Sequence, residues 1–352
     1  MTPVHQVIPS ATPRDAVTGQ AFAWRRLLAA WGYPGEIISE HVHPDLADQV
    51  VRLDKGGRGL LKRDKVILRY AIYSKSAEAL LAAPARTAFC YHNITPGHLL
   101  RDFNAAIADL CDRGRQALST FHTHPAVVIA DSQFNAADLL EAGLGHARVV
   151  PLLLDLPSRP SHHSRRGDPI VLFVGRIAPN KRLEDTIKAF SLYQRHHASE
   201  ASLVLVGSHS GFDNYRFALE RLVDKLGTRR VFFTGPVSTQ ARDFWYRRAH
   251  VYLSMSVHEG FCAPVVEALA HGAPVVARGA GAVPETLAGA GVLVDGEDLP
   301  FIAEALHEVV SSSSTREALG EVADQRLAEL RPDVVAPQIR AALDPLLQAD
   351  GA

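Results

Sequence analysis

The chain has 352 residues, of which 47% are hydrophobic and 21% charged, a composition that suits about two globular domains. Its formal net charge of −1 gives it no overall basic character, so the composition implies no nucleic-acid partner. No apolar run approaches the ~20 residues that a membrane-spanning helix needs, and the N-terminal sequence lacks the charged and apolar regions of a signal peptide.

The cysteine content indicates a reducing cellular compartment. Cys90, Cys111 and Cys262 are odd in number and far apart, so they form neither a disulfide framework nor a metal-spaced pair. Free cysteines fit a reducing environment. We therefore expect a cytoplasmic protein, and peripheral contact with the inner face of a membrane stays open.

The N-terminal half alternates short strands with helices. Hydrophobic residues recur at helical spacing over 20–31, between strand-like runs at 4–8 and 36–39. Further elements follow in chain order: strands over 66–73, 86–91 and 126–130, a helix over 99–118, and a helix from about Asn135 with Ser132 as its N-cap. Such alternation is typical of a parallel α/β sheet.

Residues 157–169 interrupt this pattern. The segment is rich in proline, serine, histidine and arginine and offers little to bury, which is typical of a linker. It predicts one domain over 1–160 and a second over 161–332. A helix over 333–347 begins the last segment, 333–352, which we expect to pack back on the first domain.

The second domain shows the clearer α/β pattern. Its expected strands cover 169–174, 202–206, 230–234, 251–255, 273–277 and 291–294, and its expected helices include 183–197 and 215–225. Three of the strands end in glycine, at Gly175, Gly207 and Gly235. Ligands of open α/β sheets bind beyond the carboxyl ends of the strands, and glycine lets the backbone approach a ligand closely.

A glycine and two cations follow the first strand of this domain. Gly175 and Arg176 end the strand, and Lys181 stands just before the next helix. A guanidinium fork and a compact ammonium can both grip phosphate oxygens. The alternative interpretation is a solvated basic turn.

Two glutamates flank a glycine-containing turn further along. Glu259 is followed by Gly260, Phe261, Cys262 and Ala263, and a helix that starts near Pro264 carries Glu267. The backbone N–H groups of residues 261–263 would point out of the amino end of that helix, a geometry that binds anions. Taken singly, either glutamate is better explained as a favourable charge near a helix N-terminus. Taken together as one ten-residue unit, the two glutamates favour a binding site.

The unit from Glu259 to Glu267 resembles the E-x7-E signature of retaining glycosyltransferases of family 4, which have the GT-B fold. The segment from Gly175 to Lys181 resembles the same family's phosphate-binding loop, and residues 283–285 and 291–295 resemble its downstream segment. Residues 91–93 and 130–134 resemble its N-terminal half more loosely. This resemblance implies an α/β fold of two Rossmann-like, doubly wound parallel-sheet domains that face a central cleft.

The resemblance also implies roles for single residues. Arg176 and Lys181 would hold the donor diphosphate, Glu259 the transferred sugar and Glu267 the ribose hydroxyls. His92 would lie near the reacting sugar. His92, Arg176, Lys181 and Glu259 are therefore the expected catalytic residues. The full expected donor site consists of Gly19, Gly175, Arg176, Lys181, Gly207, Gly235, Pro236, Glu259, Gly260, Phe261, Cys262, Ala263 and Glu267.

Two positions depart from the family pattern. The loop after the first strand has one glycine, Gly19, where many members have a pair, and Cys262 stands where a glycine is common. Gly19 is the best candidate for a phosphate contact from that loop.

We expect no cofactor and no metal. No Asp-x-Asp stands at a strand end, and the pairs His41/His43 and His122/His124 have no evident third ligand in a chain with 17 histidines. The expected reaction moves a hexose-type sugar, with retention, from a nucleotide-diphosphate donor, UDP- or GDP-linked, to a carbohydrate, glycolipid or small-molecule acceptor. A GT-B epimerase or hydrolase, an inactive donor-binding homologue and an oligomeric assembly stay open.

Overall fold

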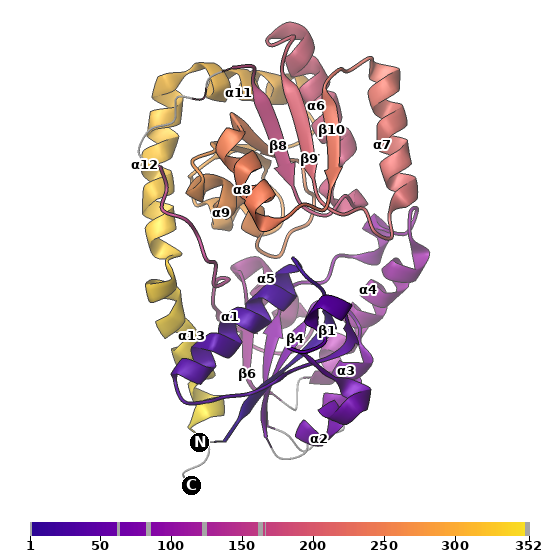
Figure 1. Ribbon diagram of the computed structural model, residues 1–352, viewed down its shortest axis with the longest axis vertical. Helices are drawn as coiled ribbons and strands as arrows, with labels where there is room; N and C mark the ends of the chain where they lie inside the picture. Colours follow the sequence, from indigo (N-terminus) through magenta and orange to yellow (C-terminus); the bar gives the residue numbers. More distant parts are fainter. Residues whose placement is uncertain are drawn as a thin grey trace. The chain divides into compact units, whose positions relative to one another are not determined.

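The computed structural model describes residues 2–61, 64–81, 86–121, 125–160, 165 and 167–348. These residues form two compact units, each built on one parallel β-sheet (Figure 1). Unit 1 consists of Met1–Gly97, Ile107–Leu154 and Leu330–Ala352, and unit 2 of His98–Ala106 and Asp155–Glu329. The main segment of unit 1 ends at Leu154, and the short segment His98–Ala106 of the N-terminal half groups with unit 2.

The sheet of unit 1 has the order β3-β2-β1-β4-β5-β6-β7, and its neighbouring strands are all parallel. Its strands are β1 (Val4–Ala11), β2 (Ile37–Val42), β3 (Val51–Arg52), β4 (Lys65–Tyr70), β5 (Arg86–Tyr91), β6 (Pro125–Ala130) and β7 (Arg148–Val149). The five longer strands confirm the sequence prediction. The edge strands β3 and β7 were not predicted, because two residues are too few to show a period.

Helices connect these strands as parallel pairing requires. The connecting helices are α1 (Ala16–Ala30), α2 (Arg58–Leu60), α3 (Lys75–Leu81), α4 (Ala105–Ala117) and α5 (Gln133–Glu141). The last helix of the chain, α13 (Pro332–Leu347), also belongs to unit 1 but connects no strands. The Ser132 hydroxyl accepts a hydrogen bond from the Asn135 amide at 3.1 Å, so the predicted N-cap is confirmed. The helix predicted over 99–118 begins only at Ala105, after a short 3₁₀ turn.

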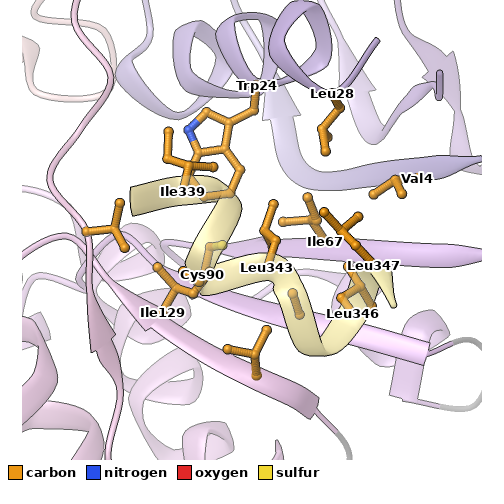
Figure 2. Packing of buried hydrophobic residues seen from close by; sticks show 14 of the residues in the cluster. Val4, Trp24, Leu28, Ile67, Cys90, Ile129, Ile339, Leu343, Leu346 and Leu347 are labelled. Atoms are coloured by element: carbon orange, nitrogen blue, oxygen red, sulfur yellow. The ribbon is translucent and has the colours of Figure 1, made fainter. Parts of the chain in front are cut away.

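The core of unit 1 is completed by α13. Figure 2 shows Ile339 and Leu343 of this helix directed toward Trp24 of α1 and toward Ile67 and Cys90 of the sheet. At the end of the helix, the buried Lys65 ammonium donates to the Leu347 carbonyl at 2.7 Å. A segment from the far end of the sequence therefore closes one face of the first sheet.

The sheet of unit 2 has the order β10-β9-β8-β11-β12-β13 and is also parallel throughout. Its strands are β8 (Ile170–Val174), β9 (Ser202–Val206), β10 (Val231–Gly235), β11 (Val251–Ser254), β12 (Val275–Arg278) and β13 (Val292–Val294). Its helices are α6 (Leu183–His196), α7 (Asp213–Leu226), α8 (Thr239–Arg248), α9 (Ala263–Ala270), α10 (Val283–Leu287), α11 (Leu299–Ser311) and α12 (Ser313–Glu329). All six strands were predicted to within two residues at each end. Among the described residues, no helix has both the length and the apolar character needed to cross a membrane.

The described part of the linker is held by its arginines. Arg159 forms an ion pair with Asp324 of α12 at 2.9 Å. Arg165 donates to the carbonyls of Arg247, His271 and Gly272. These contacts all lie in unit 2, so Arg159 and Arg165 are both anchored to that unit.

Candidate functional site

The strands β8 and β9 of unit 2 end side by side in glycines. The Gly175 amide donates to the Val206 carbonyl at 2.9 Å, and a Cβ added to Gly207 would lie 1.8 Å from the Gly175 carbonyl oxygen. Gly207 also has φ of +149°, a region that disfavours other residues. The glycine at 207 is therefore required for this close approach of two strand ends, where the donor was expected.

The neighbouring strand end places two further predicted residues. Gly235 ends β10 with φ of +69°, and its carbonyl accepts the Gly207 amide at 3.1 Å. Pro236 follows directly. The three predicted glycines therefore lie in one row along the carboxyl edge of the sheet.

Lys181 and Glu259 meet at this edge. The Lys181 ammonium lies 2.7 Å from the Glu259 carboxylate, and their side chains are only 18% and 12% exposed. Burial is the largest influence and disfavours the ammonium, but Glu259 and Cys262 together outweigh it, so the pKa of Lys181 lies above its ordinary value. The sequence predicted that both residues belong to one site, and the structure joins them directly.

Arg176 lies on the loop that follows β8. Its guanidinium donates to the Ser210 carbonyl at 2.9 Å and stands 5.0 Å from the centre of the Phe212 ring. Its charge acts on Lys181, whose pKa it lowers slightly against the effect of Glu259. Both predicted cations therefore belong to one electrostatic environment.

The segment after Glu259 leads into the amino end of α9. Cys262 takes a left-handed conformation, with φ of +68°, and the helix begins at Ala263 with Pro264 in its first turn. Proline has no amide hydrogen to leave unpaired in the first turn of a helix. This agrees with the predicted start near Pro264, one residue earlier.

Residues 281–286 hold the backbone of this loop in place. The Ala282 amide donates to the Glu259 carbonyl at 3.0 Å, and the Thr286 hydroxyl donates to the Phe261 carbonyl at 2.5 Å. A Cβ on Gly281 would lie 2.6 Å from that Glu259 carbonyl oxygen. The segment that begins α10 therefore fixes the backbone on both sides of Gly260.

Glu267 lies on α9 and is bound by two side chains of α8. Arg242 donates to one carboxylate oxygen at 2.9 Å, and the Tyr246 hydroxyl donates to the other at 2.8 Å. Burial raises the pKa of Glu267, and both partners oppose that rise. Sequence reasoning missed Arg242 and Tyr246, although their separation of one helical turn places them on one face of a helix.

His92 belongs to unit 1, at the carboxyl end of β5. Its Nδ1 lies 2.7 Å from the Asp131 carboxylate and its Nε2 lies 3.1 Å from the Arg69 guanidinium. Arginine can only donate, so we assign the proton of the imidazole to Nδ1 and the accepting lone pair to Nε2. Both ring nitrogens are thus used within unit 1.

Arg69 was not singled out from the sequence. It is fully buried at the end of β4, donates to the Gln6 side chain at 2.9 Å and stands 4.3 Å from the centre of the Trp24 ring. Burial lowers the pKa of Arg69, an effect that Cys90 and Asp131 partly offset. The guanidinium therefore holds His92 against the strand ends of unit 1.

The structure gives Gly19 a different environment from the expected loop. Gly19 lies inside α1, and its amide donates to the Asp15 carbonyl at 2.9 Å. The Asp15 carboxylate also caps the helix by accepting from the Thr18 amide at 2.8 Å. An amide already bonded within a helix, behind an acidic cap, does not favour a phosphate at this residue.

The histidine pairs show no metal cluster. His41 and His43 are exposed and lie near Glu40 and Asp45, at 3.5 Å and 3.6 Å. The residues that the structure describes contain no group of three or more His, Cys, Asp or Glu side chains arranged for a metal ion. The pair at 122 and 124 lies outside the described residues.

The segment that contains the unit 2 site is similar to a known protein family. Residues 157–326 match the family model described as "Glycosyl transferases group 1". A D-inositol 3-phosphate glycosyltransferase of Corynebacterium jeikeium is 32% identical over 223 residues, which cover 58% of this chain and 53% of that protein. The O-antigen chain mannosyltransferase B of Escherichia coli is 28% identical over 42% of this chain and 38% of its own length. The chain thus matches about half the length of these relatives or less.

Solved structures resemble the whole chain. Anabaena HepE, solved in complex with UDP and glucose, has a TM-score of 0.75 at 19% identity and covers 98% of this chain and 100% of its own. Sucrose-phosphate synthase from Thermosynechococcus elongatus has a TM-score of 0.76 at 20% identity, over 99% of this chain and 100% of its own. The fold is therefore GT-B, and residues 157–326 are similar to glycosyl transferases group 1.

Proposed function

We propose that this protein is a glycosyltransferase that moves a hexose-type sugar from a nucleotide-diphosphate donor to a hydroxyl acceptor, with retention of configuration and without a metal ion. The observation that carries the proposal is the ion pair of Lys181 and Glu259, at 2.7 Å. It lies at the carboxyl edge of a parallel sheet, inside the segment that matches glycosyl transferases group 1. That edge is where such sheets bind nucleotides.

The leaving group explains why cations are needed. As the bond between the sugar and the diphosphate breaks, negative charge grows on the phosphate oxygens. Lys181 and Arg176 would stabilise that charge, together with the backbone at the amino end of α9. Groups held in place before the reaction lower the barrier because they need no reorganisation at the moment of transfer.

The ion pair also suggests how the site is kept ready. Glu259 neutralises Lys181 and holds its ammonium at the strand ends. When a diphosphate takes over the ammonium, the Glu259 carboxylate would become an acceptor for a hydroxyl of the transferred sugar. Glu259 would thus bind the Lys181 ammonium first and the transferred sugar once a diphosphate is bound.

His92 would act from unit 1, near the reacting sugar. Because Asp131 and Arg69 use both of its ring nitrogens, a sugar hydroxyl would have to replace one of these partners or meet the face of the ring. No side chain in the matched motifs is an obvious nucleophile. We therefore favour a front-face route, in which the leaving phosphate takes the proton of the acceptor.

The donor and acceptor are proposed at the level of chemical class. One structural neighbour was solved with UDP and glucose, and a relative is named for D-inositol 3-phosphate. These names support a UDP-linked sugar and a hydroxyl acceptor. The proposal also includes a GDP-linked sugar as donor, and a carbohydrate, a glycolipid or a small molecule as acceptor. A cytoplasmic location stays a prediction.

A thermal-shift screen against UDP-, GDP-, ADP- and TDP-sugars tests the donor class, because a ligand that binds only the folded state raises its melting temperature. The stabilising donor is then incubated with and without candidate acceptors, and the anomeric configuration of the product is read by NMR. Transfer that requires an acceptor and yields a retained product is expected. Rapid release of free sugar without acceptor would indicate a hydrolase, a change of sugar identity an epimerase, and stabilisation by no donor would contradict the proposal.

A further inference from the structure

The carboxylate of Glu267 is held by both of its oxygens. Arg242 donates to Oε1 at 2.9 Å and Tyr246 to Oε2 at 2.8 Å. The Tyr246 hydroxyl also lies 3.3 Å from the Pro264 carbonyl, but it has one proton, and the shorter contact is to Glu267. The plane of the carboxylate is therefore fixed by two donors rather than by one.

Both donors come from one face of α8. Ser238 caps this helix by accepting from the Ala241 amide at 3.2 Å, so its first turn is anchored. Tyr246 is fully buried, and its ring lies 5.2 Å from that of His271, which stands at the other end of α9. The two helices therefore fix the donors relative to the acceptor before any ligand binds.

The anchoring leaves acceptor capacity on each oxygen. An ionised carboxylate offers about four lone-pair directions, and within the described residues Arg242 and Tyr246 take one on each oxygen. The side chain of Glu267 is 18% exposed, so it is partly accessible to solvent. Two oxygens, each with capacity left, match two adjacent hydroxyl groups, the arrangement found on a ribose ring and lost when the 2′-hydroxyl is missing.

We propose that Arg242 and Tyr246 are positioning residues that hold Glu267 as a two-oxygen acceptor for adjacent ribose hydroxyls, and that they thereby make the site select ribonucleoside diphosphate donors over 2′-deoxy donors. This inference rests on the proposed function, since it assigns the sugar of the nucleotide to Glu267. It excludes TDP-sugars made with deoxyribose as good donors. A site built to bond a hydroxyl discriminates because its buried acceptor is left unpaired by the analogue.

The test is a double-mutant cycle, in which protein side chains and ligand hydroxyls are removed separately and together. Calorimetry measures the dissociation constants of UDP, 2′-deoxy-UDP and 3′-deoxy-UDP, and of the GDP series if UDP does not bind. The full-length proteins are wild type, Tyr246→Phe, Arg242→Gln and Arg242→Lys. Arg247→Gln is the matched control, because Arg247 is the exposed neighbour of Tyr246 on the same helix.

Wild type and the control should bind the ribonucleotide at least ~10-fold tighter than either deoxy analogue, the discrimination expected of one hydrogen bond to a charged group. Tyr246→Phe and Arg242→Gln should reduce this ratio to about 3-fold or less, mainly by weakening the ribonucleotide, while Arg242→Lys restores part of it. Melting curves confirm that each variant is folded.

Each other outcome has a distinct meaning. If wild type binds nucleoside diphosphates but does not discriminate, the inference fails and the proposed function stands. If the variants weaken ribo and deoxy ligands equally, Arg242 and Tyr246 have only a structural role and the inference also fails. If wild type binds no nucleoside diphosphate, the proposed function itself is wrong.

Discussion

Replacing Glu259 by glutamine should strengthen the binding of a nucleoside diphosphate while it slows transfer. In the structure the carboxylate neutralises Lys181 across 2.7 Å. A diphosphate that binds Lys181 must therefore displace this partner and then lie beside a carboxylate of the same sign. Glutamine has nearly the same shape and can still accept a hydrogen bond from the ammonium, but it carries no charge.

The magnitude follows from the geometry. Nζ of Lys181 lies 2.7 Å from Oε1 of Glu259, and a charged hydrogen bond to phosphate adds about 2.8 Å, so the two anions would lie within ~6 Å of each other. Unit charges at ~6 Å repel by ~3 kcal/mol at an effective dielectric constant of about 20. Because both side chains retain some contact with solvent, we expect a gain of roughly 10- to 100-fold in affinity rather than the full value.

Calorimetry with UDP or GDP, in the absence of sugar, measures this effect for wild type and Glu259→Gln. Glu304→Gln is the control, because it removes the same charge from a carboxylate that is 64% exposed on α11, and its affinity should equal that of wild type. The turnover of Glu259→Gln should fall at least ~10-fold, because the transferred sugar loses a charged acceptor. Equal or weaker nucleotide binding by Glu259→Gln would refute the reasoning that a diphosphate must displace Glu259 in order to bind Lys181.

Further predictions concern the other groups of the two sites. Arg176→Ala and Lys181→Ala should each lower kcat at least ~10-fold in folded protein, and wild-type turnover in both would contradict the phosphate assignment. His92→Ala should impair transfer more than donor binding, which calorimetry and steady-state kinetics together measure. Arg69→Met should lower the free energy of unfolding by about 2–4 kcal/mol, since the polar partners of this arginine stay buried without a donor; an unchanged melting temperature would contradict this. Prolonged treatment with EDTA should leave the transfer rate unchanged, and its loss would indicate a required metal.

The sequence predicted those parts of the fold that depend on local pattern. The apolar run over 202–206 forms β9 with the predicted bounds, because a strand buried on both faces needs a continuous apolar stretch. Helix α8 was missed, since its residues are mainly polar and only Tyr246 is buried. The two-residue strands β3 and β7 carry no period at all.

The same distinction applies to the candidate sites. Lys181 and Glu259 could be predicted because each stands in a short motif with glycine or a helix start beside it. Arg69 sits in the run Lys65–Tyr70, which simply reads as a strand, and its partner Gln6 lies on β1. Which strands become neighbours is decided by the order of the sheet, so a local pattern could not reveal this contact. The contact between Arg242 and Glu267 depends instead on how helices α8 and α9 pack together, which a local pattern does not reveal either.

The docking of α13 has a consequence for biosynthesis. The apolar face that Trp24, Leu28 and Ile67 present is covered by residues of α13, such as Ile339 and Leu343. During translation, this face of the first-made unit therefore stays uncovered until the whole of unit 2 has left the ribosome. Nascent chains expose such a surface to chaperones and to aggregation, and premature termination before α13 would leave the exposure permanent. The unit that is translated first is thus the last to become complete.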